Sequence, residues 1–316
     1  MKRATGSHEA TRLRLTSDSF SRACDFIRKN ARDVDRALFE YHFENGQADE
    51  VLGELVKYQN SDGGFGNAIE PDLRLRASSP FATSVGLQYC MEIGLGEESS
   101  VIESAMEYLV STYDTEHNYW TYTFMDVNEE PHAPWWHLEE IAPPKESSWP
   151  NPSAELFGYC HRYANLIPDN LLRQMNQRAL TNLESSETIE GLYNVMCWER
   201  AYESIPEPLK SKAMEKLERT FREIVPLTQE TLGEIRVFWL SPSIDSILAR
   251  THPDNVYHLL DLEIQKQAED GGWWPTWKWG QFEDVWPIAE KEWAGRITLN
   301  CLKALKRFDL NKAYLP

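Results

Sequence analysis

Positive charge is scarce in this sequence, and long hydrophobic runs are missing. The 316 residues include 32 lysines and arginines against 50 aspartates and glutamates, which gives a net charge of −18. Such an acidic chain repels polyanions, so nucleic acid and acidic membrane surfaces are not expected partners. No stretch approaches the ~20 apolar residues that a bilayer-spanning helix needs, so no membrane span is expected.

Cysteine is also sparse, with five residues and no C-x-x-C pair. Most of the five lie among apolar neighbours at helical spacing, which predicts reduced, buried thiols in a cytoplasmic protein. The basic N-terminus is not followed by an apolar run, so it is not a secretory signal. We expect residues 1–16 to be a flexible tail and residues 17–316 to form a single domain.

Strand-like alternation is rare, and residues 119–124 are the best short candidate. Apolar residues instead recur every three to four positions, which predicts an all-α protein. Ser79-Pro80, Asn151-Pro152 and Ser241-Pro242 each place a capping side chain before a proline at a helix start. Later helices are expected over residues 80–94, 98–113, 152–166, 169–184, 188–204, 208–224, 242–250, 254–268 and 288–308.

One phrase occurs twice, at residues 59–66 (QNSDGGFG) and at residues 267–274 (QAEDGGWW). Each copy follows an apolar helix and leads through an acidic loop into another helix. Glycine reaches positive φ without steric cost, and Asp can accept hydrogen bonds from backbone N–H groups in the turn. The phrase is therefore predicted to join helical hairpins, and weaker remnants occur at residues 117–120 and 189–193.

The phrase Q-x-x-D-G-G-F/W, together with SSPFATS at residues 78–84, resembles the repeats of the terpenoid cyclase and protein prenyltransferase superfamily. The resemblance covers residues 59–95 and 264–308. It implies an α/α toroid, in which helical hairpins surround a central cavity. It also implies a hydrophobic, isoprenoid-type ligand in that cavity.

The chemical motifs of that superfamily are absent. The chain has no D-x-D-D acid, no D-D-x-x-D segment for magnesium and diphosphate, and no D-x-C zinc segment. No catalytic residue can therefore be carried over, the cofactor is unknown, and whether the chain is an enzyme stays open.

Two acidic pairs follow the two phrases, and they are the candidate catalytic residues: Glu70 and Asp72, then Glu283 and Asp284. If the repeats surround a ring, both pairs emerge at the same rim, where burial would raise one pKa and create a general acid. The alternative is that these carboxylates cap helices or pair with Arg74, Arg76 or Lys278.

Tryptophan is concentrated after the second phrase and in the Pro-rich segment 117–149. The candidate substrate-binding residues are Trp120, Trp135, Trp136, Trp274, Trp277, Trp279 and Trp286. They would form an aromatic wall for an isoprenoid, a carbocation or a sugar face, or else fill the end of the toroid. Segment 117–149 is a candidate lid. Its His132, His137 and Glu139 match no strong ligand spacing, so no metal site is predicted.

Three functions remain open on these grounds. The first is a cyclase-like or prenyltransferase-like protein with acid catalysis by a loop carboxylate. The second is a carbohydrate-active lyase or hydrolase, in which tryptophans stack on sugar rings and two carboxylates cooperate. The third is a binding protein that keeps only the fold. The ligand is accordingly small and hydrophobic or sugar-like, and the oligomeric state is undetermined.

Overall fold

The computed structural model describes residues 12–311, and within that range the protein is all-α, as expected. Extended pairing there is limited to isolated bridges, one of which joins Asp114 to Tyr119, so residues 119–124 do not form the short strand that alternation suggested. The α-helices of the described range are α1 (Ser17–Asn30), α2 (Asp33–Phe43), α3 (Ala48–Leu55), α4 (Pro80–Glu92), α5 (Ser100–Thr112), α6 (Pro150–Arg162), α7 (Asp169–Glu184), α8 (Leu192–Ala201), α9 (Leu209–Ile224), α10 (Gln229–Leu232), α11 (Val237–Leu240), α12 (Ile247–Thr251), α13 (Pro253–Gln265) and α14 (Trp286–Arg307).

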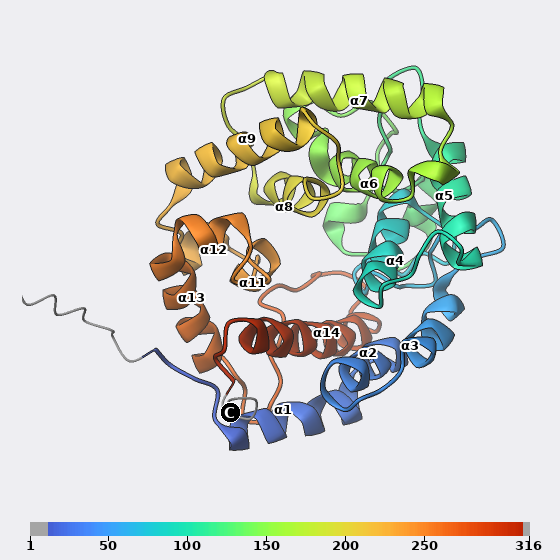
Figure 1. The fold of residues 1–316 in the computed structure, drawn as a ribbon. Coiled ribbons are helices and arrows are strands. Elements are labelled where there is room, and N and C mark those ends of the chain that lie inside the picture. Colours follow the sequence, from blue (N-terminus) through green and yellow to red (C-terminus); the bar gives the residue numbers. More distant parts are fainter. Residues whose placement is uncertain (1–11, 312–316) are drawn as a thin grey trace, which may run out of the picture.

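The helices follow one another around the molecule in chain order (Figure 1). Helices α1, α3, α5, α7, α9 and α13 lie on the outside, whereas α4, α6, α8, α11 and α14 lie inside them. The last helix, α14, packs against the first, α1. Consecutive outer and inner helices therefore form hairpins, and the first and last helices meet.

Burial patterns explain which helices are outer and which are inner. In the outer helix α9, Leu209, Ala213 and Leu217 form one buried stripe and the remaining face is largely charged. In α4 the buried residues extend around the whole circumference. A helix with one apolar stripe covers a core, whereas a helix that is apolar all round is enclosed by it.

One of the expected helix starts, Ser79-Pro80, is observed with its cap. The Ser79 hydroxyl accepts a hydrogen bond from Ala82 N at 3.1 Å, so Ser79 caps α4 ahead of Pro80. Pro287 lies in the first turn of α14, where its missing N–H costs no intrahelical bond.

The expected helix over residues 242–250 is wrong. Helix α11 ends at Leu240, and α12 begins only at Ile247. Between them the Ser246 hydroxyl donates to the Ser243 carbonyl at 2.7 Å and accepts from Ser243 N at 3.2 Å. Such local bonds offer the backbone an alternative to helix formation.

The two copies of the repeated phrase adopt the same structure. Asp62 accepts from Gly64 N at 3.0 Å, and Asp270 accepts from Gly272 N at 2.9 Å. The aromatic residue that follows each turn is fixed by its backbone. Phe65 N donates to the Thr83 hydroxyl of α4 at 3.0 Å, and Trp273 N donates to the Thr298 hydroxyl of α14 at 2.9 Å.

A third copy of this joint occurs at the weak remnant at residues 117–120. Trp120 N donates to the Ser153 hydroxyl of α6 at 3.1 Å. Asn118, with φ of 60°, takes the left-handed position that glycine holds in the other copies. The remnant at 189–193 differs, because Ile189 N bonds to Thr220 of the outer helix α9.

The glutamine of each phrase attaches the turn to a neighbouring outer helix. Gln59 Nε2 donates to the Val101 carbonyl in α5 at 2.9 Å, and Gln267 Nε2 donates to the Ser19 carbonyl in α1 at 2.8 Å. Helix α1 therefore occupies, beside the second phrase, the place that α5 occupies beside the first.

Helix α1 begins at Ser17, and one residue of the expected tail, Leu15, is packed. Leu15 is buried, and its N–H donates to the Leu310 carbonyl at 2.8 Å. Residues 1–11 of the expected tail lie outside the described range. All five cysteines are unpaired and buried, as expected. In the described part of the chain, every helix is too short or too polar to cross a bilayer.

The close approach of the first turn to α5 predicts a stability difference between two glycines. Gly63 has φ of 88°, and a Cβ there would overlap the Ser104 carbonyl, whereas Gly94 has φ of 72° and open space. Gly94→Ala should cost about 1–2 kcal/mol through its backbone conformation alone. Gly63→Ala should cost about 1–3 kcal/mol more through overpacking. Denaturant unfolding measures both, and equal losses would contradict the close packing.

Candidate functional site

A cavity of about 540 Å³ lies between the inner helices, within the size range of small-molecule sites. Its walls come from α4, α6, α8, α11 and α14, and from the loops that precede α4, α6, α11 and α14. The lining residues are Glu70, Asp72, Phe81, Val85, Gln88, Tyr122, Trp135, Trp136, Leu138, Asn151, Glu155, Tyr193, Met196, Cys197, Arg200, Glu234, Trp239, Trp277, Trp293, Arg296 and Asn300. Aromatic rings and ionisable groups thus line the same cavity.

Asp72 is the most deeply held of the loop carboxylates, with 3% of its surface exposed. Its Oδ1 accepts from the Trp279 indole at 2.6 Å, and its Oδ2 accepts from the Trp277 indole at 3.1 Å. Burial, followed by the charge of Glu70, raises the pKa of Asp72 to about 7, while indole hydrogen bonds act in the opposite direction. A carboxyl group with such a pKa can donate a proton near neutral pH.

Glu70 is buried in the same wall of the cavity. Arg296 of α14 donates from Nη1 to Glu70 Oε2 at 3.3 Å. Burial raises the pKa of Glu70, and the nearby guanidinium groups of Arg296 and Arg32 oppose that rise. Two carboxyl groups therefore interact electrostatically at one end of the cavity.

The loop that carries both carboxylates is clamped by Arg32. This buried side chain donates from Nη1 to the Ile69 carbonyl at 2.7 Å and from Nε to Asp35 at 2.7 Å. The clamp follows two residues with positive φ, Asn67 and Ala68. Left-handed backbone is costly for residues other than glycine, and it persists where surrounding contacts hold it.

A second ion pair lies farther along the wall. Arg200 of α8 donates from Nη1 to Glu155 Oε2 at 2.7 Å, and Glu155 belongs to α6. Gln88 of α4 connects the two pairs, because its Nε2 donates to Glu155 at 2.8 Å while its Oε1 accepts from Arg296 at 3.3 Å. The polar side of the cavity is thus one hydrogen-bonded row.

Aromatic rings form the other sides. Trp136 packs against Phe81 at 4.6 Å between ring centroids and against Tyr122 at 6.4 Å. Trp293 contacts Trp277 at 5.3 Å and Trp239 at 6.1 Å. These two clusters supply apolar faces that the ion pairs lack.

With this geometry in view, the chain was compared with known proteins. No family model, curated protein or solved structure matches it.

The structure brings part of the sequence-predicted site together. Glu70, Asp72, Trp135, Trp136 and Trp277 line the cavity. Trp279 lies behind this lining and reaches it through its bond to Asp72.

The other predicted residues lie outside the cavity lining. Glu283 and Asp284 are exposed on the surface, so the second acidic pair does not converge with the first. Trp286 packs on Trp279 at 5.4 Å, as part of the core. Trp120 is core as well, with its indole bonded to the Leu109 carbonyl, and the Trp274 indole bonds to Asp270 beside the turn.

The alternative ion pairs weighed for the loop acids are not those that form. Arg74 pairs with Glu292, and Arg76 lies 3.8 Å from Glu130. Glu70 instead pairs with Arg296, on a helix more than 200 residues away.

Sequence reasoning missed Glu155, Arg200, Arg296 and Gln88. All four lie on inner helices, and none belongs to a recognisable motif. In α8 the sequence did contain one indication. The spacing of Tyr193, Met196, Cys197 and Arg200 places all four on the same face of a helix. That spacing cannot tell a cavity face from a core face.

The histidines of segment 117–149 do not form a metal site. Within the described range, no group of three or more His, Cys, Asp or Glu side chains is arranged to hold a metal ion. The His132 ring lies 5.6 Å from the His137 ring in a stacked arrangement, and its Nδ1 is 2.6 Å from the Glu130 carbonyl. The segment nevertheless contributes Tyr122, Trp135, Trp136 and Leu138 to the cavity, as a lid would.

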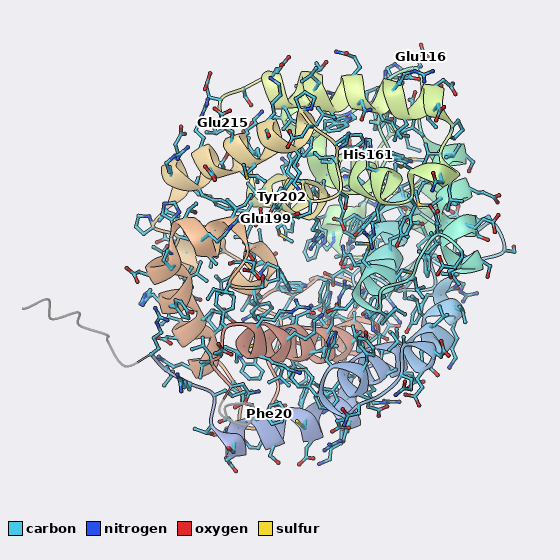
Figure 2. The ribbon with its side chains drawn as sticks, in the orientation of Figure 1. Phe20, Glu116, His161, Glu199, Tyr202 and Glu215 are labelled. Atoms are coloured by element: carbon cyan, nitrogen blue, oxygen red, sulfur yellow. The ribbon has the colours of Figure 1, made fainter. Side chains whose placement is uncertain are left out.

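Two polar residues that do not line the cavity are His161 and Glu199. Both are labelled in Figure 2. His161 of α6 contacts Asn176 of α7 at 2.7 Å, and burial lowers its pKa, which fits a structural role. Glu199 of α8 accepts from Ile247 N at 3.0 Å, and burial raises its pKa to about 7. This carboxylate supports the start of α12.

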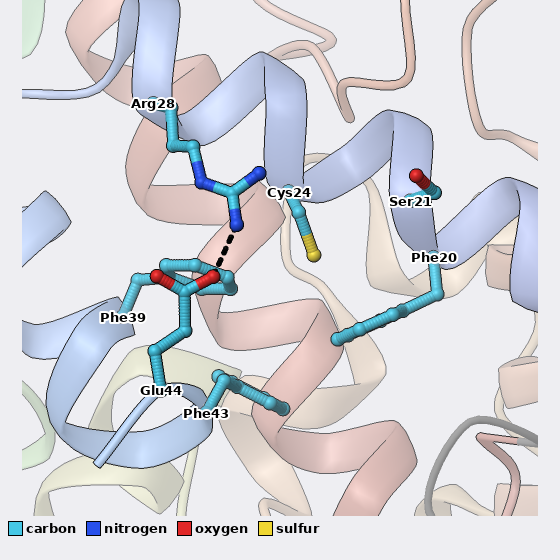
Figure 3. A pocket seen from close by; sticks show the side chains of 7 residues that line it. All are labelled: Phe20, Ser21, Cys24, Arg28, Phe39, Phe43 and Glu44. Carbon is cyan, nitrogen blue, oxygen red and sulfur yellow. Dashed lines mark hydrogen bonds and ion pairs between the residues drawn. The ribbon is translucent and has the colours of Figure 1, made fainter.

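A smaller hollow of about 300 Å³ lies between α1 and α2 (Figure 3). Phe20, Phe39 and Phe43 surround Cys24, and Arg28 pairs with Glu44 at its edge. Burial raises the pKa of the Cys24 thiol to about 11, so it is not a nucleophile near neutral pH. The larger cavity is therefore the candidate site.

The raised pKa of Asp72 predicts how stability depends on pH. The folded protein keeps a proton on Asp72 between about pH 4 and pH 7, where the unfolded chain, with an ordinary value of 3.8, has lost it. Stability should therefore fall as pH rises through this window, by on the order of 4 kcal/mol. Asp72→Asn should remove the part of this loss that Asp72 causes, so the variant gains stability relative to wild type at pH 8, whereas the part that comes from Glu199 should remain.

Urea unfolding at pH 5 and pH 8 measures the effect. Asp284→Asn is the matched control, because Asp284 is exposed, and it should keep the wild-type pH dependence. If Asp72→Asn also kept the wild-type dependence, the buried titration would be refuted.

Proposed function

We propose that the cavity binds a neutral saccharide and that Asp72 is the general acid for cleavage of a glycosidic bond. One observation carries this proposal: aromatic faces and a hydrogen-bonded row of polar groups line the same cavity. A sugar ring presents apolar C–H faces to aromatic rings and hydroxyl groups at its edge, so it can satisfy both surfaces.

The charge balance of the cavity favours a neutral ligand. Glu70 and Glu155 are each paired with an arginine, and Asp72 is partly protonated near neutral pH. Glu234 adds a carboxylate at an exposed position. No arginine of the lining is without a carboxylate partner, so a diphosphate or a polyuronate would lack a countercharge.

The proposed reaction uses the two interacting carboxyl groups. Asp72 donates its proton to the glycosidic oxygen as the bond from that oxygen to the anomeric carbon breaks, and the bonding electrons leave with the oxygen. Water adds to the anomeric carbon, and Glu70 accepts the proton that the water releases. The leaving oxygen thus gains H and the anomeric carbon gains OH, and exchange with solvent returns the proton from Glu70 to Asp72.

An isoprenoid-type ligand is the second candidate. The rings of Trp239, Trp277 and Trp293 lie together, and such faces would attract a carbocation formed by protonation from Asp72. The repeated phrase supports this candidate, as does our proposal that the hairpins form an α/α toroid like that of the cyclase superfamily. The continuous polar row counts against it, because a hydrocarbon would desolvate these groups without replacing their hydrogen bonds.

Turnover experiments test the general acid. Wild-type protein should release reducing ends from at least one of maltotriose, cellotriose, mannotriose and xylotriose, and should not turn over farnesyl diphosphate. Asp72→Asn should lower kcat about 100-fold or more, with little change in KM, because only proton donation is lost. Asp284→Asn should retain wild-type kcat.

An Asp72→Asn variant with wild-type kcat would rule out the acid assignment. Saccharide binding without turnover by wild type would instead indicate a binding protein. Turnover of the prenyl substrate alone would favour the second candidate.

Two tryptophans that were both predicted to bind substrate, Trp135 and Trp274, should differ in their effect on ligand affinity. Trp135 lines the cavity and is 49% exposed, whereas Trp274 is outside the lining. Trp135→Ala should weaken trisaccharide binding about tenfold through loss of ring stacking, with little loss of stability. Trp274→Ala should leave affinity unchanged, and calorimetric titration compares the two. Equal affinities for wild type and Trp135→Ala would exclude stacking at this position.

A further inference from the structure

The polar row along the cavity has two chemically different ends. At one end Glu70 interacts with Asp72, the proposed acid. At the other end Glu155 is paired with Arg200. Arg296 and Gln88 stand between these ends and connect them by hydrogen bonds. The far end therefore does not take part in proton transfer from Asp72, and its polar groups need another role.

Glu155 is held rigidly at that far end. The side chain is buried, with 3% of its surface exposed. Its Oε1 accepts from Gln88 Nε2 and from the Tyr159 hydroxyl, both at 2.8 Å. Its Oε2 accepts from Arg200 at 2.7 Å. A carboxylate with this many donors is fixed in place, and it fixes the guanidinium that it binds.

Arg200 has donors to spare. Its side chain is 33% exposed and lines the cavity. Within the described range, its guanidinium makes one hydrogen bond, from Nη1 to Glu155. Arg296, in contrast, bonds to both Glu70 and Gln88. A guanidinium carries five N–H donors, so Arg200 offers several of them to a ligand in the cavity.

The same face of α8 supplies an apolar platform beside these donors. Tyr193 and Met196 line the cavity one to two turns before Arg200, and Tyr193 is 51% exposed. Because Glu155 neutralises Arg200, the cluster favours a neutral acceptor over an anion. Hydroxyl oxygens on an apolar ring meet both requirements.

We propose that Glu155 and Arg200 form a subsite of the cavity. This subsite binds the hydroxyl groups of a sugar unit that neighbours the glycosidic bond cleaved at Asp72. This inference rests on the proposed function. It identifies the substrate as a saccharide of at least two units, because Arg296 and Gln88 separate the subsite from the acid. Arg200 is then a specificity-determining residue.

Calorimetric titration with maltose, cellobiose, mannobiose and xylobiose tests the subsite. Arg200→Lys keeps the positive charge beside Glu155 but loses the planar group of donors. Its Kd for the disaccharide that wild type binds should rise about tenfold, as expected for losing one or two hydrogen bonds. Arg74→Lys is the matched control, because Arg74 also pairs with a glutamate but lies outside the cavity lining, and its Kd should not change.

A second variant covers the case in which Arg200→Lys folds poorly. The double variant Glu155→Gln/Arg200→Gln removes both charges together, and it should show the same loss of affinity. Either variant should keep the wild-type difference in unfolding free energy between pH 5 and pH 8. Buried Asp72 contributes to that difference, so it would change if the whole cavity were disrupted.

The outcomes separate the two proposals. If wild type binds none of the four disaccharides and cleaves none of the four trisaccharides, the proposed function fails and the subsite fails with it. If wild type binds one and the folded Arg200 variant binds it equally well, the subsite alone is overturned.

Discussion

The hydrogen bond between the backbone of an aromatic residue and a hydroxyl of the next inner helix organises this protein. It joins Phe65 to α4, Trp120 to α6 and Trp273 to α14. The bond is buried, so losing the hydroxyl would leave an unsatisfied donor at a cost of about 1–3 kcal/mol. Each bond fixes where a loop leaves its turn, and the loops after the first and third of these turns carry Asp72 and the indoles that hold it.

Burial of carboxylates is the second constraint, and the cavity meets it in two ways. Glu70 and Glu155 are neutralised by arginines from other inner helices. Asp72 has no such partner among the contacts of the described residues and receives indole hydrogen bonds instead, so its pKa rises to about 7. Ion pairing keeps a group charged, whereas burial with neutral donors leaves it able to exchange a proton. The two environments therefore leave Asp72 able to donate a proton and keep Glu70 charged, as the proposed proton acceptor requires.

The same contrast distinguishes the candidate ligands. An isoprenoid suits the tryptophan faces but offers nothing to Arg200, Gln88 or Glu155, whereas a saccharide can use the rings and the polar row together. The proposed saccharide chemistry thus follows from groups that lie far apart in the chain. The repeated phrase, from which the isoprenoid expectation came, contributes a turn to the fold and no side chain to the cavity lining.

Local chemistry was readable from the chain. The helical periodicity, the Ser79 cap and the two Gly-Gly turns depend on residues within a few positions of one another. Of the candidate site residues, those that line the cavity are Glu70, Asp72, Trp135, Trp136 and Trp277, which follow those turns or lie in an aromatic-rich loop. The pairing of Glu70 with Arg296 and the bonds from Trp277 and Trp279 to Asp72 join residues more than 200 positions apart. Only the packing of α14 beside α1 and α2 brings these groups within reach, and the same packing leaves Glu283 and Asp284 in solvent. The sequence thus determined the turns and most of the helices, and tertiary structure decided which acids are buried, because burial depends on neighbours that the chain supplies from a distance.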